Sequence, residues 1–272
     1  MTASLRKADG LTIAEALGAS GLEARETRLL LAEASGFSQA SVIAFPERTL
    51  SREAEERFLS FAARRRRGEP VAYIVGHKEF YGLELAVTPA VLIPRPETEL
   101  LVELSLQAEF SSAVDLGTGS GALALALKRH RPGARVVAVE ASAAALAVAR
   151  RNAVKHGLEV EFRHGRWFEP LAAERVDLLI SNPPYIALGD PHLAGLGHEP
   201  AQALEAGPDG LEHLRRLVAG AARHLNPGGR LLLEHGLGQD AEVRGLMQVA
   251  GLRGVRTWPD LAGIPRVTGG KA

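Results

Sequence analysis

The 272-residue chain has no cysteine, which excludes disulfide bonds, thiolate metal ligands and a thiol nucleophile. An excess of one charge is also missing, because 32 Lys and Arg residues balance 32 Asp and Glu residues. The chain as a whole therefore has no general electrostatic attraction to nucleic acid or to an anionic membrane. The hydrophobic fraction of 46% is typical of globular proteins, so disorder is not expected.

Long apolar runs are missing as well, since no stretch approaches the roughly 20 residues that a membrane helix requires. Residues 1–10 are polar and mixed, without the apolar core of a signal peptide. We therefore expect a cytoplasmic protein that makes no membrane contact.

The 9 His residues are scattered without the spacing of metal ligands, so no metal site is expected. Scarce Asn, Gln and Met, with basic residues that are nearly all Arg, fit either a thermophile or a GC-rich genome.

The N-terminal part of the chain carries apolar residues at helical spacing. Three segments show this spacing: 11–17, 23–35 and 38–44. Ser51 is suited to cap a fourth helix, which Gly68 would end. The run 64–67 consists of four Arg residues, and it is either a solvated helix end favoured by the helix dipole or a contact for RNA or an acidic partner. We predict a helical domain over residues 1–75.

The hydrophobic period changes from helical to alternating at the end of this domain. Two short alternating runs, 79–81 and 83–87, are separated by Gly82 and predict a β-hairpin. We assign residues 76–94 to this hairpin linker, and we expect a helix to begin within 95–99.

Strand and helix patterns alternate through the rest of the chain. Strands are expected at 113–116, 135–139, 160–162, 176–181, 230–234, 255–258 and 266–268, and helices at 122–130, 143–156, 211–225 and 239–250. This alternation is typical of an α/β fold with a mostly parallel sheet covered by helices on both faces. We predict a Rossmann-like domain over residues 95–272, with its ligand site at the carboxyl ends of the strands.

A glycine-rich turn joins the first of these strands to its helix: Asp115-Leu116-Gly117-Thr118-Gly119-Ser120-Gly121. Glycines permit a tight turn and the close approach of a ligand to the backbone, although a tight turn alone occurs in many α/β proteins. The spacing differs from that of the dinucleotide fingerprint, and the Lys of a phosphate loop is missing. Glu140 ends the next strand, 19 residues after Gly121, where a carboxylate can accept both ribose hydroxyls. The glycine-rich turn and Glu140 together favour a sulfonium nucleoside over a pyrophosphate as the ligand. The alternative interpretation of Glu140 is an acidic residue that stabilises the N-terminus of a helix.

The run Asn182-Pro183-Pro184-Tyr185 follows the strand expected at 176–181. Two prolines donate no backbone hydrogen bonds and force extended geometry, so the strand stops and presents an amide, bare carbonyls and an aromatic ring. The side-chain oxygen of Asn182 and the carbonyl of Pro183 can each accept one N–H of a planar NH2 group, on which Tyr185 can stack. The alternative is a proline-rich strand terminator without a ligand.

Together these motifs resemble class I S-adenosylmethionine-dependent methyltransferases, and the last run is similar to the motif of those that methylate planar amino groups. Other stretches resemble one family more narrowly, the peptide-chain release factor glutamine methyltransferases. These stretches are Tyr73-Ile74-Val75-Gly76, Phe80-Tyr81-Gly82, Leu92-Ile93-Pro94-Arg95-Pro96-Glu97-Thr98-Glu99 and Asp190-Pro191-His192-Leu193. The resemblance spans nearly the whole chain, including the helical domain and the hairpin.

The resemblance implies roles for named residues. S-adenosylmethionine would be held by Asp115, Gly117, Thr118, Gly119, Ser120, Gly121, Glu140, Trp167 and Asn182. The substrate would be bound by Arg95, Glu97, Thr98, Asn182, Pro183, Pro184 and Tyr185, with Asn182, Pro183 and Tyr185 as the catalytic residues. The alternative role for Trp167 is ordinary packing in the core. The alternative role for residues 95–98 is to cap the helix that follows. Two positions depart from the family: Arg166 replaces the usual acid before Trp167, and His198 replaces an aromatic residue before Glu199. The contact to the adenine amino group and the roles of His198 and Glu199 are therefore left open.

The resemblance also implies a reaction and a partner. The protein would transfer a methyl group from S-adenosylmethionine to the side-chain amide nitrogen of the glutamine in the Gly-Gly-Gln motif of bacterial class 1 release factors. We expect a monomer whose helical domain grips the release factor and which binds no nucleic acid stably. One alternative is an amino-methyltransferase acting on adenine or guanine in nucleic acid. Another is a non-catalytic S-adenosylmethionine-binding partner of the translation machinery.

Overall fold

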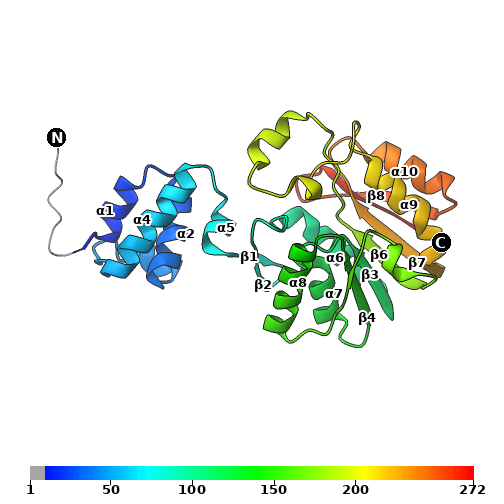
Figure 1. The fold of residues 1–272 in the computed structure, drawn as a ribbon, viewed down its shortest axis with the longest axis horizontal. Coiled ribbons are helices and arrows are strands. Elements are labelled where there is room, and N and C mark those ends of the chain that lie inside the picture. Colours follow the sequence, from blue (N-terminus) through cyan, green and yellow to red (C-terminus); the bar gives the residue numbers. More distant parts are fainter. Residues whose placement is uncertain (1–9) are drawn as a thin grey trace. The chain divides into compact units, whose positions relative to one another are not determined.

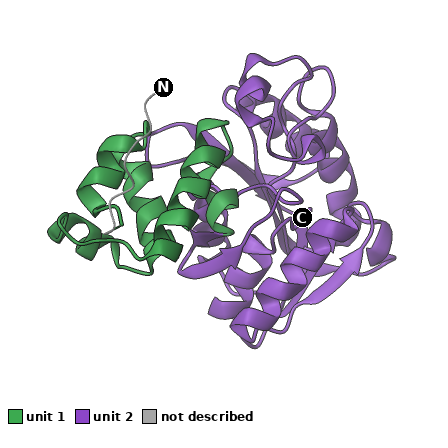
Figure 2. Cartoon of the chain, turned by 60° about the vertical axis from the view of Figure 1, so that its left-hand side comes forward, with its two compact units in different colours: residues 1–76 green, residues 77–272 purple. Residues whose placement is uncertain are grey.

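The computed structural model describes residues 10–272, and the chain forms two compact units that divide after Gly76 (Figure 2). Within residues 10–76 the helices are α1 (Ile13–Ala19), α2 (Ala24–Ser35), α3 (Gln39–Ala44), α4 (Arg52–Arg66) and α5 (Val71–Val75). The predicted helical unit is confirmed, including the cap at Ser51, whose side chain accepts a hydrogen bond from the backbone N–H of Ala54. The helix α5 was not predicted, because a helix of 5 residues between Pro70 and Gly76 is too short to show a period.

The four Arg residues at 64–67 mostly hold their own unit together. Arg64 pairs with Glu69 and also donates to the carbonyls of Tyr73 and Ile74. Arg65 lies 2.9 Å from the carboxylate of Glu26 on α2. Arg64 and Arg65 lie in the last turn of α4 as predicted, but they are paired within the unit and only partly exposed. Arg66 and Arg67 are exposed, and Arg66 also donates to the carbonyl of Ser20 at 2.8 Å. Contact of this run with a partner stays a prediction.

The second unit begins with the hairpin formed by β1 (His77–Phe80) and β2 (Leu83–Ala86). Its two turn residues, Tyr81 and Gly82, both have positive φ (48° and 75°), which is the geometry of a tight type I′ turn. The predicted hairpin is confirmed. The side chain of Asn152 donates to the carbonyl of Ala86 at 3.0 Å and accepts from the N–H of Ala86 at 2.7 Å. These two bonds attach the hairpin to the rest of the second unit.

The rest of the second unit is a seven-stranded sheet with the strand order β5-β4-β3-β6-β7-β9-β8 (Figure 1). Its strands are β3 (Ser112–Leu116), β4 (Arg135–Glu140), β5 (Glu161–His164), β6 (Val176–Ser181), β7 (Leu225–Glu234), β8 (Arg253–Pro259) and β9 (Pro265–Lys271). Its α-helices are α6 (Glu99–Leu106), α7 (Ala122–His130), α8 (Ala143–His156), α9 (Glu212–His224) and α10 (Asp240–Val249). The strands are parallel except where β9 pairs antiparallel with β7 and β8. The predicted α/β fold is confirmed.

Helices cover both faces of this sheet because buried residues alternate along each strand. In β3, Ala113 packs in the core beneath α6 and α7, whereas Val114 packs in the core beneath α9 and α10. In β6, Leu178 and Leu179 separate in the same way. Figure 1 shows these helices on opposite sides of the strands. No helix among residues 10–272 is long and apolar enough to cross a membrane.

The largest error in a predicted strand start concerns β7. The strand β7 begins at Leu225 and not at Arg230, so the preceding helix ends at His224. Leu225 pairs with Val176 and Arg230 pairs with Leu178, and the residues between them bulge from the ladder. Because Pro227 and the two glycines after it are typical turn residues, they concealed the early start of the strand.

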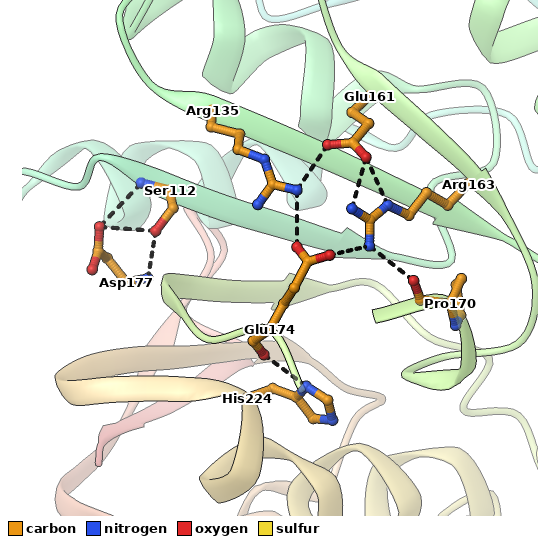
Figure 3. A network of polar contacts seen from close by, with 8 residues as sticks. All are labelled: Ser112, Arg135, Glu161, Arg163, Pro170, Glu174, Asp177 and His224. Carbon is orange, nitrogen blue, oxygen red and sulfur yellow. Dashed lines mark hydrogen bonds and ion pairs between the residues drawn. The ribbon is translucent and has the colours of Figure 1, made fainter. Parts of the chain in front are cut away.

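Polar networks tie the amino-terminal ends of the strands together (Figure 3). Arg135 on β4 and Arg163 on β5 both bind Glu161 and Glu174. Beside them, one carboxylate oxygen of Asp177 accepts four hydrogen bonds, from the backbone N–H and the hydroxyl groups of Ser111 and Ser112. Burial opposes ionisation of Asp177, but hydrogen bonds from Asn226, Ser111 and Ser112 outweigh it and hold the pKa well below its usual range.

Asp177→Ala is expected to lower the free energy of unfolding by about 2–4 kcal/mol at neutral pH, since several donors lose an ionised acceptor. The folded pKa lies below the unfolded value of about 3.9, so this stabilisation is complete above that value. It is lost as pH falls through the lower, folded pKa. Urea unfolding at neutral pH and at about pH 2 measures both effects. Equal stability of the variant and the wild type at neutral pH would contradict the prediction.

Candidate active site

A pocket opens in the second unit at the carboxyl ends of β3 and β6. The chain leaves β3 toward β4 and β5 on one side, whereas β6 begins the other half of the sheet, so this is the switch point where α/β folds bind ligands. The hollow measures about 1080 Å³ including the part open to solvent. The predicted site residues that line it are Arg95, Thr98, Gly117, Thr118, Gly119, Ser120, Glu140, Trp167, Asn182 and Pro184.

The glycine loop between β3 and α7 needs glycine at the position nearest the pocket wall. Gly117 has a φ of 81°, which side chains rarely adopt. A Cβ atom there would also lie 3.3 Å from the indole ring of Trp167. Gly121 caps α7 in the left-handed conformation and lies outside the lining. The loop therefore presents bare backbone to the pocket, with Trp167 packed against it.

Asp115 supports this loop and does not line the pocket. It is 1% exposed, and its carboxyl accepts hydrogen bonds from the hydroxyl of Thr118 at 2.6 Å and from the N–H of Ala124 at 3.3 Å. Burial raises the pKa of Asp115 to about 7, against the lowering effect of these hydrogen bonds. Asp115 therefore holds the shape of the loop, and the contact with the cofactor predicted for it stays a prediction.

Glu140 lies at the end of β4 and faces the pocket. One carboxylate oxygen accepts from the N–H of Gly119 and the other from the N–H of Ser142, both at 2.9 Å. These bonds fix the plane of the carboxylate, and each oxygen keeps a second lone pair for a ligand hydroxyl. The side chain is thus preorganised to accept two hydrogen bonds.

Trp167 and His213 also line the pocket, and their rings lie 5.3 Å apart at an angle of 49°. Trp167 is 9% exposed, and its indole N–H is buried without a hydrogen-bond partner in the described part of the chain. The Nδ1 atom of His213 is also buried without one. Burial lowers the pKa of His213, so the neutral ring is favoured. His213 was not predicted as a site residue, because a single His in an amphipathic helix gives no local signal in the sequence. Arg166 also lines the pocket.

Asn182 lies at the end of β6 with a defined amide orientation. Its Nδ2 donates to the hydroxyl oxygen of Thr98 at 2.9 Å, which leaves the Oδ1 atom as a free acceptor. The preceding Ser181 ties β6 to β3, since its hydroxyl donates to the carbonyl of Leu116 at 2.5 Å. The structure therefore joins Asn182 to Thr98, two predicted site residues that are 84 positions apart in the sequence.

Besides Asp115 and Gly121, three further predicted residues lie outside the lining of the pocket. Pro183 is buried, and Glu97 is exposed. The ring of Tyr185 is half-buried behind the lining, and its hydroxyl donates to Glu234 at 3.3 Å. The stacking role of Tyr185 stays a prediction. The backbone carbonyl of Tyr185 accepts from Nε2 of Gln239 at 3.0 Å, so Gln239 clamps the motif in place.

Glu199 has a defined partner in the loop before α6. Its side chain is 3% exposed and forms an ion pair with Arg95, which is 34% exposed. Its second oxygen accepts from the N–H of Ile93 at 3.0 Å. The role that the sequence left open for Glu199 is therefore to fasten the stretch that borders the pocket, whereas His198 beside it is exposed.

Glu199→Ala is expected to lower the free energy of unfolding by about 3–5 kcal/mol, because it leaves a buried N–H and a guanidinium without their acceptor. Urea unfolding of the second unit measures this loss. The double variant Glu199→Ala with Arg95→Met is the control, and it is expected to be more stable than the sum of the two single losses predicts. Additive losses would contradict a direct pairing.

Two family models match the chain. The model described as "PrmC N-terminal domain" matches residues 12–76, and the model described as "Methyltransferase small domain" matches residues 96–195. The chain is 48% identical over 273 residues to a release factor glutamine methyltransferase of Burkholderia pseudomallei, with 96% of each chain covered. It is 49% identical over 252 residues to a protein of the same name from Pseudomonas aeruginosa, covering 90% of this chain and 91% of the relative.

Solved structures are similar in fold. A methyltransferase from Pyrococcus furiosus matches with a TM-score of 0.55 and 19% identity over 79% of this chain and 96% of that chain. The 16S rRNA N2 G1207 methyltransferase of Thermus thermophilus, solved with AdoMet and guanosine, matches with a TM-score of 0.54 and 23% identity. That similarity covers 72% of this chain and 49% of that chain.

Proposed function

Because the chain belongs to the family of release factor glutamine methyltransferases, we propose that it methylates the side-chain amide nitrogen of a glutamine in class 1 release factors, using S-adenosylmethionine. The family predicted from the sequence motifs is confirmed by relatives of 48% and 49% identity. One observation carries the site proposal: the glycine loop with Glu140 and the free acceptor of Asn182 line a single pocket.

The residues of this pocket fit S-adenosylmethionine. The glycine loop leaves backbone exposed beside Trp167, and Glu140 offers two acceptors for ribose hydroxyls. Trp167 and His213 line the same pocket, and each has a buried ring nitrogen without a hydrogen-bond partner in the described part of the chain. His213 would supply a polar partner for the base, since Arg166 stands where the family has an acid. When bound, the cofactor supplies a methyl group on positively charged sulfur that a nitrogen lone pair can attack.

The motif at the end of β6 would hold the substrate amide. An amide nitrogen is a weak nucleophile because its lone pair is delocalised into the carbonyl group. Oδ1 of Asn182 and the carbonyl of Pro183 would each accept one N–H, which draws electron density toward nitrogen and orients it for attack. Once methylated, the nitrogen is acidic and loses its proton to water, so the side chains need to supply no general base.

We assign the grip on the release factor to the helical unit, with residues 1–75 as the binding domain and 76–94 as a hairpin linker to the catalytic domain at 95–272. The match of residues 12–76 to the N-terminal family model supports this assignment. The glutamine of the Gly-Gly-Gln loop is the proposed target, because a flexible loop can reach the recessed acceptors of Asn182 and Pro183. We also propose that the protein is a monomer and that it acts in the cytoplasm.

The test offers methyl-labelled S-adenosylmethionine with purified class 1 release factors, with rRNA and with DNA in separate reactions. Label on the release factor that disappears when the loop glutamine is replaced by alanine supports the proposal. Label on nucleic acid alone would favour the second candidate, an amino-methyltransferase acting on adenine or guanine. Cofactor binding without any transfer would instead favour a non-catalytic partner of the translation machinery.

A further inference from the structure

The loop between β5 and β6 carries Trp167, which lines the pocket, and its backbone is strained at that residue. Trp167 has a φ of 54°, in the left-handed region that bulky side chains rarely adopt. Such a conformation costs free energy, and it persists only where the surrounding structure fixes it. Contacts of the neighbouring residues therefore have to hold the loop in place.

The next residue, Phe168, anchors the loop to α9. Its ring stacks on the ring of His224, with 4.7 Å between the centroids and 10° between the planes. His224 is 8% exposed, and its Nδ1 donates to the carbonyl of Glu174 at 2.9 Å, which fixes the ring that Phe168 stacks on (Figure 3). Glu174 is in turn paired with Arg135 and Arg163. The anchor is thus tied to the polar network of the sheet.

A glycine on α9 makes the space for this ring. A Cβ atom at Gly220 would lie within 2.9 Å of three atoms of the Phe168 ring, closer than real Cβ contacts come. Gly220 lies inside α9, where glycine is less favourable than alanine, and it has no positive φ that would require glycine. The close approach of Phe168 is therefore the reason that this position needs glycine.

One face of α9 holds both aromatic residues of the loop. His213, Gly220 and His224 are spaced by seven and four residues, which places them on one side of the helix. Trp167 contacts His213 near the start of α9. Phe168 contacts the other two residues near its end. Because Trp167 and Phe168 share a peptide plane, a shift of the second residue moves the backbone of the first.

We propose that Phe168 is a positioning residue for the cofactor site. Its stack on His224 holds Trp167 in the strained backbone that places the indole ring in the pocket wall. The inference rests on the cofactor role proposed for Trp167. Phe168 itself is not among the residues that line the pocket, and it is assigned no contact with the cofactor or the substrate. Without the anchor the loop relaxes, so cofactor affinity falls while the substrate motif is unaffected.

Gly220→Ala tests this anchor, because it adds a methyl group where the Phe168 ring lies. S-adenosylmethionine is expected to bind about tenfold more weakly, since the binding-competent loop is then populated only about a tenth of the time. At saturating cofactor, kcat on a release factor is expected to change less than about threefold. Calorimetric titration and steady-state kinetics measure the two quantities separately.

Gly245→Ala is the matched control. Gly245 lies inside α10 without a positive φ, and a Cβ atom there would meet no atom within 4 Å in the described part of the chain. The control therefore makes the same substitution inside a helix and displaces no side chain. It is expected to bind S-adenosylmethionine as the wild type does. Equal affinities of Gly220→Ala and Gly245→Ala would overturn the inference.

Tryptophan fluorescence reports the position of the loop without any cofactor. The chain has 2 Trp residues, so a Trp258→Phe background leaves Trp167 as the only emitter. Trp167 is 9% exposed in the anchored loop, and it gains exposure when the anchor is lost. Gly220→Ala is therefore expected to shift the emission to longer wavelength, whereas Gly245→Ala is not. A loss of stability alone would leave the emission of the folded protein unchanged, and that result in Gly220→Ala would refute the positioning role.

A double-variant cycle shows whether Gly220 acts through Phe168. Phe168→Ala is expected to weaken cofactor binding about tenfold, and the double variant with Gly220→Ala is expected to bind no more weakly than the worse single variant. Additive losses would contradict a shared mechanism. Thermal unfolding checks that each variant folds, and Phe168→Ala decides the matter if Gly220→Ala does not fold.

The wild-type protein separates this inference from the proposed function. If the wild type methylates release factors and Gly220→Ala binds the cofactor equally tightly, only the positioning role fails. If the wild type binds no S-adenosylmethionine, the proposed function fails and this inference fails with it.

Discussion

Asn182→Ala is expected to lower turnover on release factors by about 10²–10³-fold, the size of effect seen when one preorganised polar group is removed from a reaction site. The variant loses the Oδ1 acceptor, which the bond from Nδ2 to Thr98 leaves without a partner in a residue that lines the pocket. Affinity for S-adenosylmethionine is expected to change much less, because the glycine loop and Glu140 remain in place. Single-turnover kinetics and calorimetric titration of the cofactor measure the two quantities separately.

The matched control for this variant is Gln248→Ala, which removes an exposed amide on α10. It is expected to leave turnover and cofactor affinity unchanged. Wild-type turnover in Asn182→Ala would refute the role assigned to its amide oxygen. A loss of cofactor binding that accounts for the whole effect would instead make Asn182 a cofactor residue alone.

Glu140→Ala is expected to weaken the binding of S-adenosylmethionine by about 100-fold, because two hydrogen bonds to a charged acceptor are lost. Part of the loss comes from the loop, since the N–H groups of Gly119 and Ser142 also lose their acceptor. At saturating cofactor, kcat is expected to fall by less than about tenfold, because the substrate motif is untouched. Calorimetric titration of the variant measures the dissociation constant directly.

Glu159→Ala serves as the control, since Glu159 is an exposed glutamate outside the active-site pocket. It is expected to bind the cofactor as the wild type does. An unchanged dissociation constant in Glu140→Ala would contradict the assignment of the ribose to this carboxylate. A variant that unfolds is recognised by its thermal transition, and Glu140→Gln then repeats the test with one acceptor oxygen kept.

Much of the fold could be predicted from the sequence because its signals are local. The helices at 122–130 and 143–156 have the predicted bounds, since apolar spacing and terminal glycines are read within one segment. The strand at 176–181 was predicted in the same way. The failures are also local in origin: α5 is too short to show a period, and the bulge near Pro227 hid the start of β7.

The sequence also indicated the main motifs that line the pocket. Motifs after β3, β4 and β6 pointed to Gly117, Glu140 and Asn182, and the parallel sheet brings all three strand ends to one edge. It did not distinguish residues that line the pocket from residues that support the lining. Asp115 and Tyr185 belong to the supporting group in this structure.

By itself, the sequence determined the fold class, the family and the motifs that mark the site, because periodicity and motif spacing lie within short segments. Only the tertiary structure decided which side chains hold those motifs. Ile93 and Glu199 are 106 positions apart, and Tyr185 and Glu234 are 49 apart, yet each pair is bonded. No spacing rule connects such residues, since their contact depends on which strands are neighbours and where each strand ends. The orientation of the Asn182 amide is decided at that level, by the hydroxyl of Thr98 that folding brings within 2.9 Å of its Nδ2.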